Sequence, residues 1–158
     1  MAMGLISRRG LAVLAGVFSL GAAPPGPVGQ WHGTYTCAQG LTMLDLSIAA
    51  PDATHLRGEF HFSADDSNPN VPEGCFSMKG GYDPDRRAVR LMPGAWRLRP
   101  FGYVMVGLEG RMDATGQHLS GDVTHADGCT IFTLERDALE PEPDDVCSKP
   151  HSVARLGG

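Results

Sequence analysis

Hydrophobic and polar residues alternate along most of the chain after residue 30, and one apolar pattern recurs five times. Each copy has a large apolar residue, a spacer, a glycine, a spacer and a second large apolar residue. Strand side chains alternate between the two faces of a sheet, so the three residues of each copy share one face. The copies are Trp31-Gly33-Tyr35, Leu56-Gly58-Phe60, Met78-Gly80-Tyr82, Leu108-Gly110-Met112 and Leu119-Gly121-Val123.

The glycine at the centre of each copy carries further information. A glycine inside a strand usually marks a sharp bend, a bulge or the close approach of another group. Five of them on the apolar face predict a strongly coiled sheet, most simply a sheet closed into a small barrel.

The alternating segments predict eight short strands, separated by turns rich in Gly, Asp and Pro. After the first 30 residues no window shows a helical period. The sequence therefore predicts an all-β fold, a single antiparallel up-and-down β-barrel of about eight strands. A barrel of that size is either filled by side chains or holds one small ligand. The expected strands are 31–37, 43–48, 55–62, 76–82, one around Val89 and Leu91, 103–112, 118–124 and 129–136.

The two ends of the chain differ from this central region. Residues 1–23 have the pattern of a signal peptide, with Arg8 and Arg9 before an uncharged apolar run that is too short to span a membrane. The arginine pair is compatible with both a twin-arginine and an ordinary secretory signal. Residues 24–30 are a Pro/Gly-rich linker, 31–137 the barrel, and 138–158 an acidic, Pro-rich tail.

Charge limits the partners that we expect. The 158-residue chain has a formal net charge of -5. Its length after the signal peptide suits one domain. An acidic surface argues against nucleic acid and anionic membranes as partners, and the apolar segments predict no membrane span.

The four cysteines are an even count, which in an exported chain favours two disulfides. Cys37 ends the first expected strand and Cys129 begins the last, and these strands are neighbours in a closed barrel. We therefore expect Cys37–Cys129, which leaves Cys75–Cys147 to tether the tail to the barrel. Four free thiols are the alternative. Because no Cys-x-x-Cys occurs, we expect no metal site.

The candidate contact surface lies in residues 93–103, which we expect to be a stiff connection between two strands. Aromatic residues with arginine are typical of binding hot spots and of sugar- or anion-binding surfaces. The alternative is that the tryptophan closes one end of the barrel and the arginines are solvated. The candidate residues are Trp96, Arg97, Arg99, Phe101 and Tyr103, with the loop 65–70 expected nearby.

Alternation in the sixth expected strand places Val104 and Val106 on the inner face and Tyr103 and Met105 on the outer face. Outward apolar residues need a cover, which would be the tail or a partner. His61 is likewise expected to point outward. No nucleophile elbow, zinc-protease motif or phosphate-binding glycine loop is present, so we expect neither an enzyme nor a cofactor.

Four stretches carry a resemblance to a known family, namely 33–40, 68–72, 100–108 and 128–132. With these, the chain resembles an uncharacterised family of small exported bacterial β domains, which implies export and a β-barrel but no established activity. Cys75 and Cys147 depart from its pattern. The opening Trp31-x-Gly33-x-Tyr35 is similar to lipocalin- and avidin-like proteins, which bind small molecules. Tyr35-x-Cys37 with a late cysteine is similar to periplasmic lysozyme inhibitors, whose inhibitory Ser-Gly loop has no counterpart here.

Together these patterns indicate an exported, disulfide-stabilised, non-enzymatic binding or interaction module of the cell envelope, periplasmic or secreted. Its partner would be a protein or an envelope glycan. One alternative is a carrier that holds a small apolar ligand in a cavity inside the barrel. The other is an inhibitor of a cell-wall hydrolase such as lysozyme.

Overall fold

The structure is a computed structural model that describes residues 25–140 and Cys147. The expected signal peptide and most of the expected tail lie outside these residues. The described chain forms eight β-strands, and no helix in this part is long and apolar enough to cross a bilayer. The strands are β1 (Gly29–Cys37), β2 (Gly40–Ala49), β3 (Leu56–Ala64), β4 (Gly74–Asp83), β5 (Ala88–Leu98), β6 (Gly107–Met112), β7 (His118–Thr124) and β8 (Ile131–Ala138).

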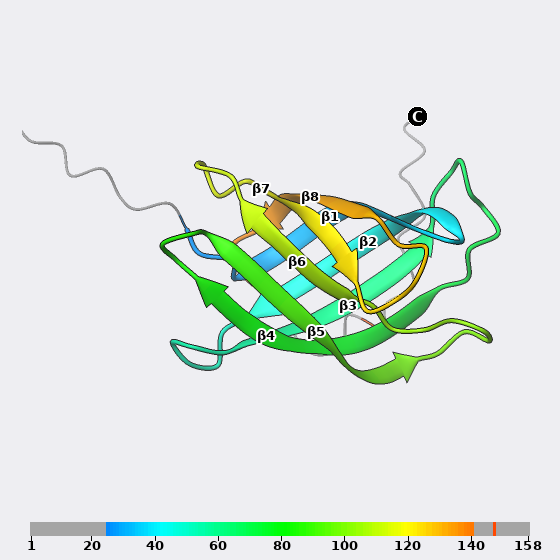
Figure 1. The fold of residues 1–158 in the computed structure, drawn as a ribbon, viewed down its shortest axis with the longest axis horizontal. Coiled ribbons are helices and arrows are strands. Elements are labelled where there is room, and N and C mark those ends of the chain that lie inside the picture. The colour runs from blue at the N-terminus through cyan, green and yellow to red at the C-terminus, as the bar shows by residue number, and fades with distance from the viewer. Residues whose placement is uncertain (1–24, 141–146, 148–158) are drawn as a thin grey trace, which may run out of the picture.

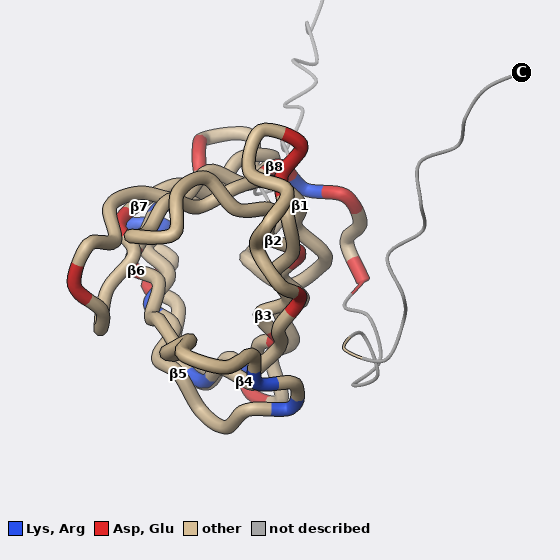
Figure 2. The backbone as a smooth tube through the Cα atoms, turned by 90° about the vertical axis from the view of Figure 1, so that its right-hand side faces the viewer, with Lys and Arg blue, Asp and Glu red and all other residues tan. Residues whose placement is uncertain are grey.

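The eight strands close into one antiparallel up-and-down barrel, as the sequence predicted. Each strand pairs with the next along the chain, and β8 returns to pair with β1, with Gly33 opposite Leu134. Figure 1 shows the strands running obliquely across the molecule, and Figure 2 shows them following one another around a ring. Closure leaves no free sheet edge, which in an open sheet is a site of aggregation.

Side chains on the inward face fill the barrel. The five recurring patterns supply much of this core: nine of their ten large apolar residues are buried, and Tyr82 is half-buried. Phe62, Phe76 and Phe132 join them and are at most 2% exposed. The expectation that the patterns mark one inward face is therefore confirmed.

Four of the five glycines of these patterns, namely Gly33, Gly80, Gly110 and Gly121, lie where a neighbouring strand approaches closely. A Cβ on Gly80 would lie 1.8 Å from the carbonyl oxygen of Arg90, and one on Gly33 would lie 2.1 Å from that of Thr133. Gly110 and Gly121 lie directly opposite each other in β6 and β7. These contacts leave no room for a side chain, so glycine is what permits the tight coiling of this small barrel.

The barrel end that carries the N-terminus of β1 is closed by Arg136 of β8. Its guanidinium lies 4.1 Å from the centroid of the Trp31 ring. It also donates to the carbonyl oxygens of Val28 at 2.6 Å, Gly26 at 2.7 Å and Gly116 at 2.8 Å. The opposite end, here called the loop end, carries the β1–β2, β3–β4, β5–β6 and β7–β8 connections, at the right of Figure 1.

The prediction that residues 93–103 form a connection is wrong for residues 93–98, which belong to β5. β5 continues through Pro93 to Leu98, and its pairing with β4 shifts register on both sides of Phe76. This irregularity accommodates the proline, which has no N–H to donate. The Ser77 hydroxyl accepts a hydrogen bond from the Ala95 amide at 3.0 Å, which satisfies a backbone donor there.

The expected sixth strand is also wrong at its start, because β6 begins at Gly107. Residues 99–106 are a connection, and its side chains do not follow the strand alternation. Val104, expected inside, is 63% exposed, whereas Tyr103 and Met105, expected outside, pack against the core. From Val106 onward the expected inward residues are correct. At the other end of the barrel, β1 begins at Gly29, inside the expected linker.

Both expected disulfides are present. Cys37–Cys129 joins the end of β1 to the β7–β8 connection, and Cys75–Cys147 attaches Cys147 to the outer face of β4. No cysteine of the chain is free. Two disulfides fit an oxidising compartment, either extracellular or periplasmic.

Candidate functional site

The β5–β6 connection projects an aromatic ring from the loop end. The Tyr103 amide donates to the Pro100 carbonyl oxygen at 3.3 Å, and Gly102 has a φ of +80°. This is the positive φ that the third position of a type II turn requires. The turn leaves Phe101 fully exposed, at 104% of its reference area.

Two neighbouring aromatic residues anchor this turn to the core. The Tyr103 ring stacks on Phe62, with centroids 5.4 Å apart and planes at 16°. Trp96 contacts Phe76 edge-on at 5.2 Å and Phe62 at 6.5 Å. Trp96 is therefore partly buried and packs against the core, and the Arg99 guanidinium lies 5.9 Å from the centroid of its ring.

Arg97 lies apart from the other candidate residues. It faces the outside of the barrel and binds the Glu59 carboxylate with both Nε, at 2.9 Å to Oε2, and Nη2, at 2.6 Å to Oε1. Glu59 is only 8% exposed, so this bidentate pair is partly desolvated. The structure thus gathers Trp96, Arg99, Phe101 and Tyr103 near the loop end and places Arg97 on the outer face.

Beside the projecting turn is a pocket of about 260 Å³, here called the loop-end pocket. Its walls come from the ends of β1, β3 and β4 and from three connections. The pocket combines an aromatic floor with polar side chains, Gln39 and Asp127. It is lined by Tyr35, Cys37, Ala38, Gln39, Phe62, Phe76, Gly102, Tyr103, Val104, Val106, Ala126, Asp127 and Cys129.

Hydrogen bonds order one side of this pocket. The Gln39 amide nitrogen lies 3.2 Å from the Tyr35 hydroxyl and 3.3 Å from the Thr42 hydroxyl, and it donates to both. Burial raises the pKa of the Tyr35 phenol, and the nearby Tyr103 raises it further. Tyr35 therefore stays neutral and presents a ring and a hydroxyl to the pocket.

The β3–β4 connection is held against the same end of the barrel. The Asn68 side-chain amide donates to the Gln39 carbonyl oxygen at 2.7 Å and to that of Leu41 at 3.0 Å. Asp65 pairs with Asn68 in an isolated bridge and accepts from the Ser67 amide at 2.8 Å. Through the Gln39 backbone this loop supports the wall of the loop-end pocket.

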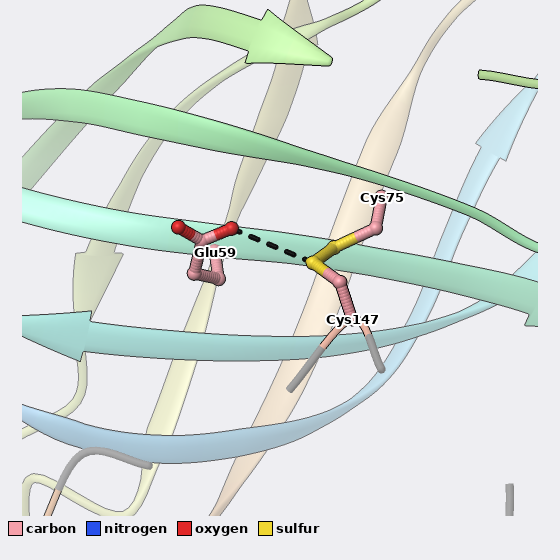
Figure 3. A group of neighbouring side chains, drawn as sticks. All are labelled: Glu59, Cys75 and Cys147. Carbon is pink, nitrogen blue, oxygen red and sulfur yellow. Dashed lines mark hydrogen bonds between the residues drawn. A yellow bond between two sulfur atoms is a disulfide. The ribbon is translucent and has the colours of Figure 1, made fainter. Parts of the chain in front are cut away.

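A second polar group lies on the outer face, where Figure 3 shows Glu59 beside the Cys75–Cys147 disulfide. The Cys147 sulfur is 3.5 Å from Glu59 Oε2. Both sulfurs are bonded to each other and are not thiolates, so this group does not offer metal ligands in the oxidised protein. His61, on the same face, is only 3% exposed and lies 2.7 Å from the Glu73 carboxylate.

Sequence reasoning missed most of the pocket. The sequence patterns single out neither Asp127 nor Gln39. Phe62 is predicted only as the last residue of the expected strand 55–62. No local pattern could have found them as a site, because their side chains come together only when three connections and the ends of β1, β3 and β4 assemble at one end of a closed barrel.

Comparison with known proteins supports the fold alone. No family model and no curated protein match the chain, so the resemblance to an exported bacterial family is not confirmed. A redesigned β-barrel among the solved structures is similar, with 18% sequence identity and a TM-score of 0.51. The match covers 70% of this chain and 91% of the designed one.

Proposed function

We propose that this protein is an exported, disulfide-stabilised, non-enzymatic binding module of the cell envelope that makes contact through its loop end. The single observation that carries the proposal is Phe101, fully exposed on an ordered turn next to the loop-end pocket. A lone exposed apolar residue is ordinary, but here a projecting ring and an apolar recess lie side by side.

The energetics of this arrangement favour association. Burying a Phe side chain contributes about 1.5–3 kcal/mol. The turn is already held by Gly102 and by the Tyr103–Phe62 stack, so little conformational entropy remains to be lost on binding. Arg99, exposed beside Trp96, adds a cation that a partner carboxylate or glycan could meet.

The envelope location is inferred from the sequence and the cysteines. Residues 1–23 have the signal-peptide pattern, and the two disulfides require an oxidising environment to persist. The partner is accordingly a protein or a glycan of the same compartment.

Affinity capture from an envelope fraction tests the proposal with a matched pair of variants. Phe101→Ala removes the projecting ring, and Met92→Ala removes an apolar side chain that is 44% exposed on β5. We expect a partner that wild type and Met92→Ala retain and Phe101→Ala loses. Equal capture by both variants would contradict the placement of the contact surface.

The loop-end pocket itself favours a second candidate function, binding of a small apolar ligand. Because side chains such as Trp31, Tyr35 and Phe60 fill the barrel interior, such a ligand would lie at the loop end rather than deep inside. Ala126→Phe would add a ring to the pocket wall. A fluorescent apolar probe should bind wild type and not this variant, and equal binding to both would exclude this site.

A further inference from the structure

The lining of the loop-end pocket combines aromatic rings with one carboxylate. Four of its residues are aromatic: Tyr35, Phe62, Phe76 and Tyr103. Asp127 is the one charged residue among the described residues that line it, and none of them is Lys, Arg or His. Aromatic ring faces and a carboxylate both attract positive charge.

Asp127 lies in the β7–β8 turn and lines the loop-end pocket. Asp52, Asp65, Asp83 and Asp113 accept hydrogen bonds within their own turns, whereas the side chains of the turn residues Asp66 and Asp85 have none within the described residues. Within the described part of the chain, the Asp127 side chain has neither a hydrogen bond nor an ion pair. Its carboxylate is therefore available to a ligand.

No arginine is among the described residues that line this pocket. Arg99 lies over Trp96 rather than in the pocket, and Arg97 binds Glu59 on the outer face. The pocket therefore keeps the negative potential of Asp127, and the acidic chain as a whole adds to it.

We propose that the loop-end pocket binds a small free organic ammonium ion of about the size of choline. This inference rests on the proposed binding function of the same pocket and names its ligand class. The apolar groups of the ion would contact the aromatic rings, and its positive nitrogen would lie near Asp127. A quaternary ammonium suits such a site because it is weakly hydrated and makes cation–π contacts without needing acceptors for N–H groups.

The size of the pocket agrees with this class of ligand. At about 260 Å³ it lies just below the roughly 300–1,000 Å³ of sites for drug-sized ligands. A compact ion fits that space, whereas a larger ligand would extend into solvent.

Isothermal titration calorimetry with choline tests the inference against a matched neutral compound. The control ligand is the alcohol in which carbon replaces the choline nitrogen, so the two differ in charge and hardly in shape. We expect choline to bind roughly tenfold more tightly, as a partly desolvated cation–π contact provides. In NMR spectra the trimethyl signal of bound choline should shift upfield, because ring currents act on groups stacked against aromatic faces.

Two variants separate a site effect from a general charge effect. Asp127→Asn should weaken choline binding about fivefold and leave the neutral alcohol unchanged. Asp66→Asn removes an equal charge from the β3–β4 connection, outside the pocket lining, and should change neither. Asp127 is exposed and has no partner in the described chain, so thermal unfolding of Asp127→Asn should match wild type.

The outcomes are distinguishable. Equal affinity for choline and the alcohol would overturn the ligand class while leaving the apolar pocket of the proposed function intact. Binding of neither compound would overturn the ammonium site, and the Phe101 capture experiment would still stand on its own. Pelleting with phosphatidylcholine vesicles without binding of free choline would overturn the assignment to a free ion.

Discussion

Tyr103 stacks on Phe62 with ring centroids 5.4 Å apart and an interplanar angle of 16°. One ring comes from the connection that carries Phe101, and the other comes from β3 and the core. The contact therefore links the exposed turn to the barrel interior. It makes the position of the proposed contact surface depend on core packing.

Replacing Tyr103 by Leu should lower the free energy of unfolding by about 1–2 kcal/mol, since an aromatic pair contributes beyond its buried area. It should also raise hydrogen exchange in residues 99–106. Urea denaturation and exchange mass spectrometry measure the two effects. Phe101→Ala is the matched control, expected within about 0.5 kcal/mol of wild type because its ring is fully exposed. A Phe101→Ala protein as destabilised as Tyr103→Leu would contradict this account.

Neighbouring glycines of β4 provide a test of the coiled sheet. Gly80→Ala would place a Cβ 1.8 Å from the Arg90 carbonyl oxygen, whereas the nearest atom to a Cβ on Gly81 is 3.5 Å away. We expect Gly80→Ala to cost about 2–3 kcal/mol, because a paired backbone carbonyl cannot move without breaking its ladder. Gly81→Ala should be nearly neutral. Chemical denaturation compares the two, and similar losses would mean that steric crowding is not the reason for Gly80.

The two disulfides should contribute unequally. Cys37–Cys129 spans 92 residues and crosses the β1–β8 closure, so Cys37→Ser with Cys129→Ser should cost up to about 4 kcal/mol in the chain-entropy description. Cys147 lies beyond β8, so the Cys75–Cys147 disulfide does not link the two strands that close the barrel. Cys75→Ser with Cys147→Ser should therefore cost about half as much or less. Differential scanning calorimetry of both double variants decides this order.

Acid stability should depend on Asp113 in the β6–β7 turn. Hydrogen bonds from the Thr115 hydroxyl, and next from His118, hold the pKa of this carboxyl well below its usual range. The ionised group is thus favoured by folding. Its stabilisation is present above about pH 4, the ordinary pKa of aspartate, and is lost as pH falls through the folded-state pKa.

The measurement is the free energy of unfolding between about pH 5 and pH 2. In Asp113→Asn the free energy of unfolding should fall less steeply with decreasing pH than it does in wild type. Asp122→Asn is the control, since the Asp122 side chain has no hydrogen bond within the described residues. An unchanged acid profile in Asp113→Asn would remove this turn as a source of pH dependence.

The sequence by itself determined the fold class, the inward face and the disulfides. Alternation and mid-strand glycine are local signals, and they report directly on which side of a strand is buried and where strands crowd. The positions of Cys37 and Cys129 then followed from closure, because the first and last strands of an up-and-down barrel are neighbours.

Only the tertiary structure decided the contacts of the side chains that lie outside the inward-facing pattern. Pro93 predicted the end of a strand. β5 nevertheless continues past it, because the irregular pairing with β4 does not require a hydrogen bond from the proline nitrogen. Tyr103 turned inward because residues 99–106 leave the sheet and lose its alternation. Arg97 binds Glu59, which is 38 residues away in the sequence. Asp127 lines the same pocket as the aromatic residues of β1, β3 and β4. Such encounters depend on barrel closure, so no local pattern in the chain specifies them.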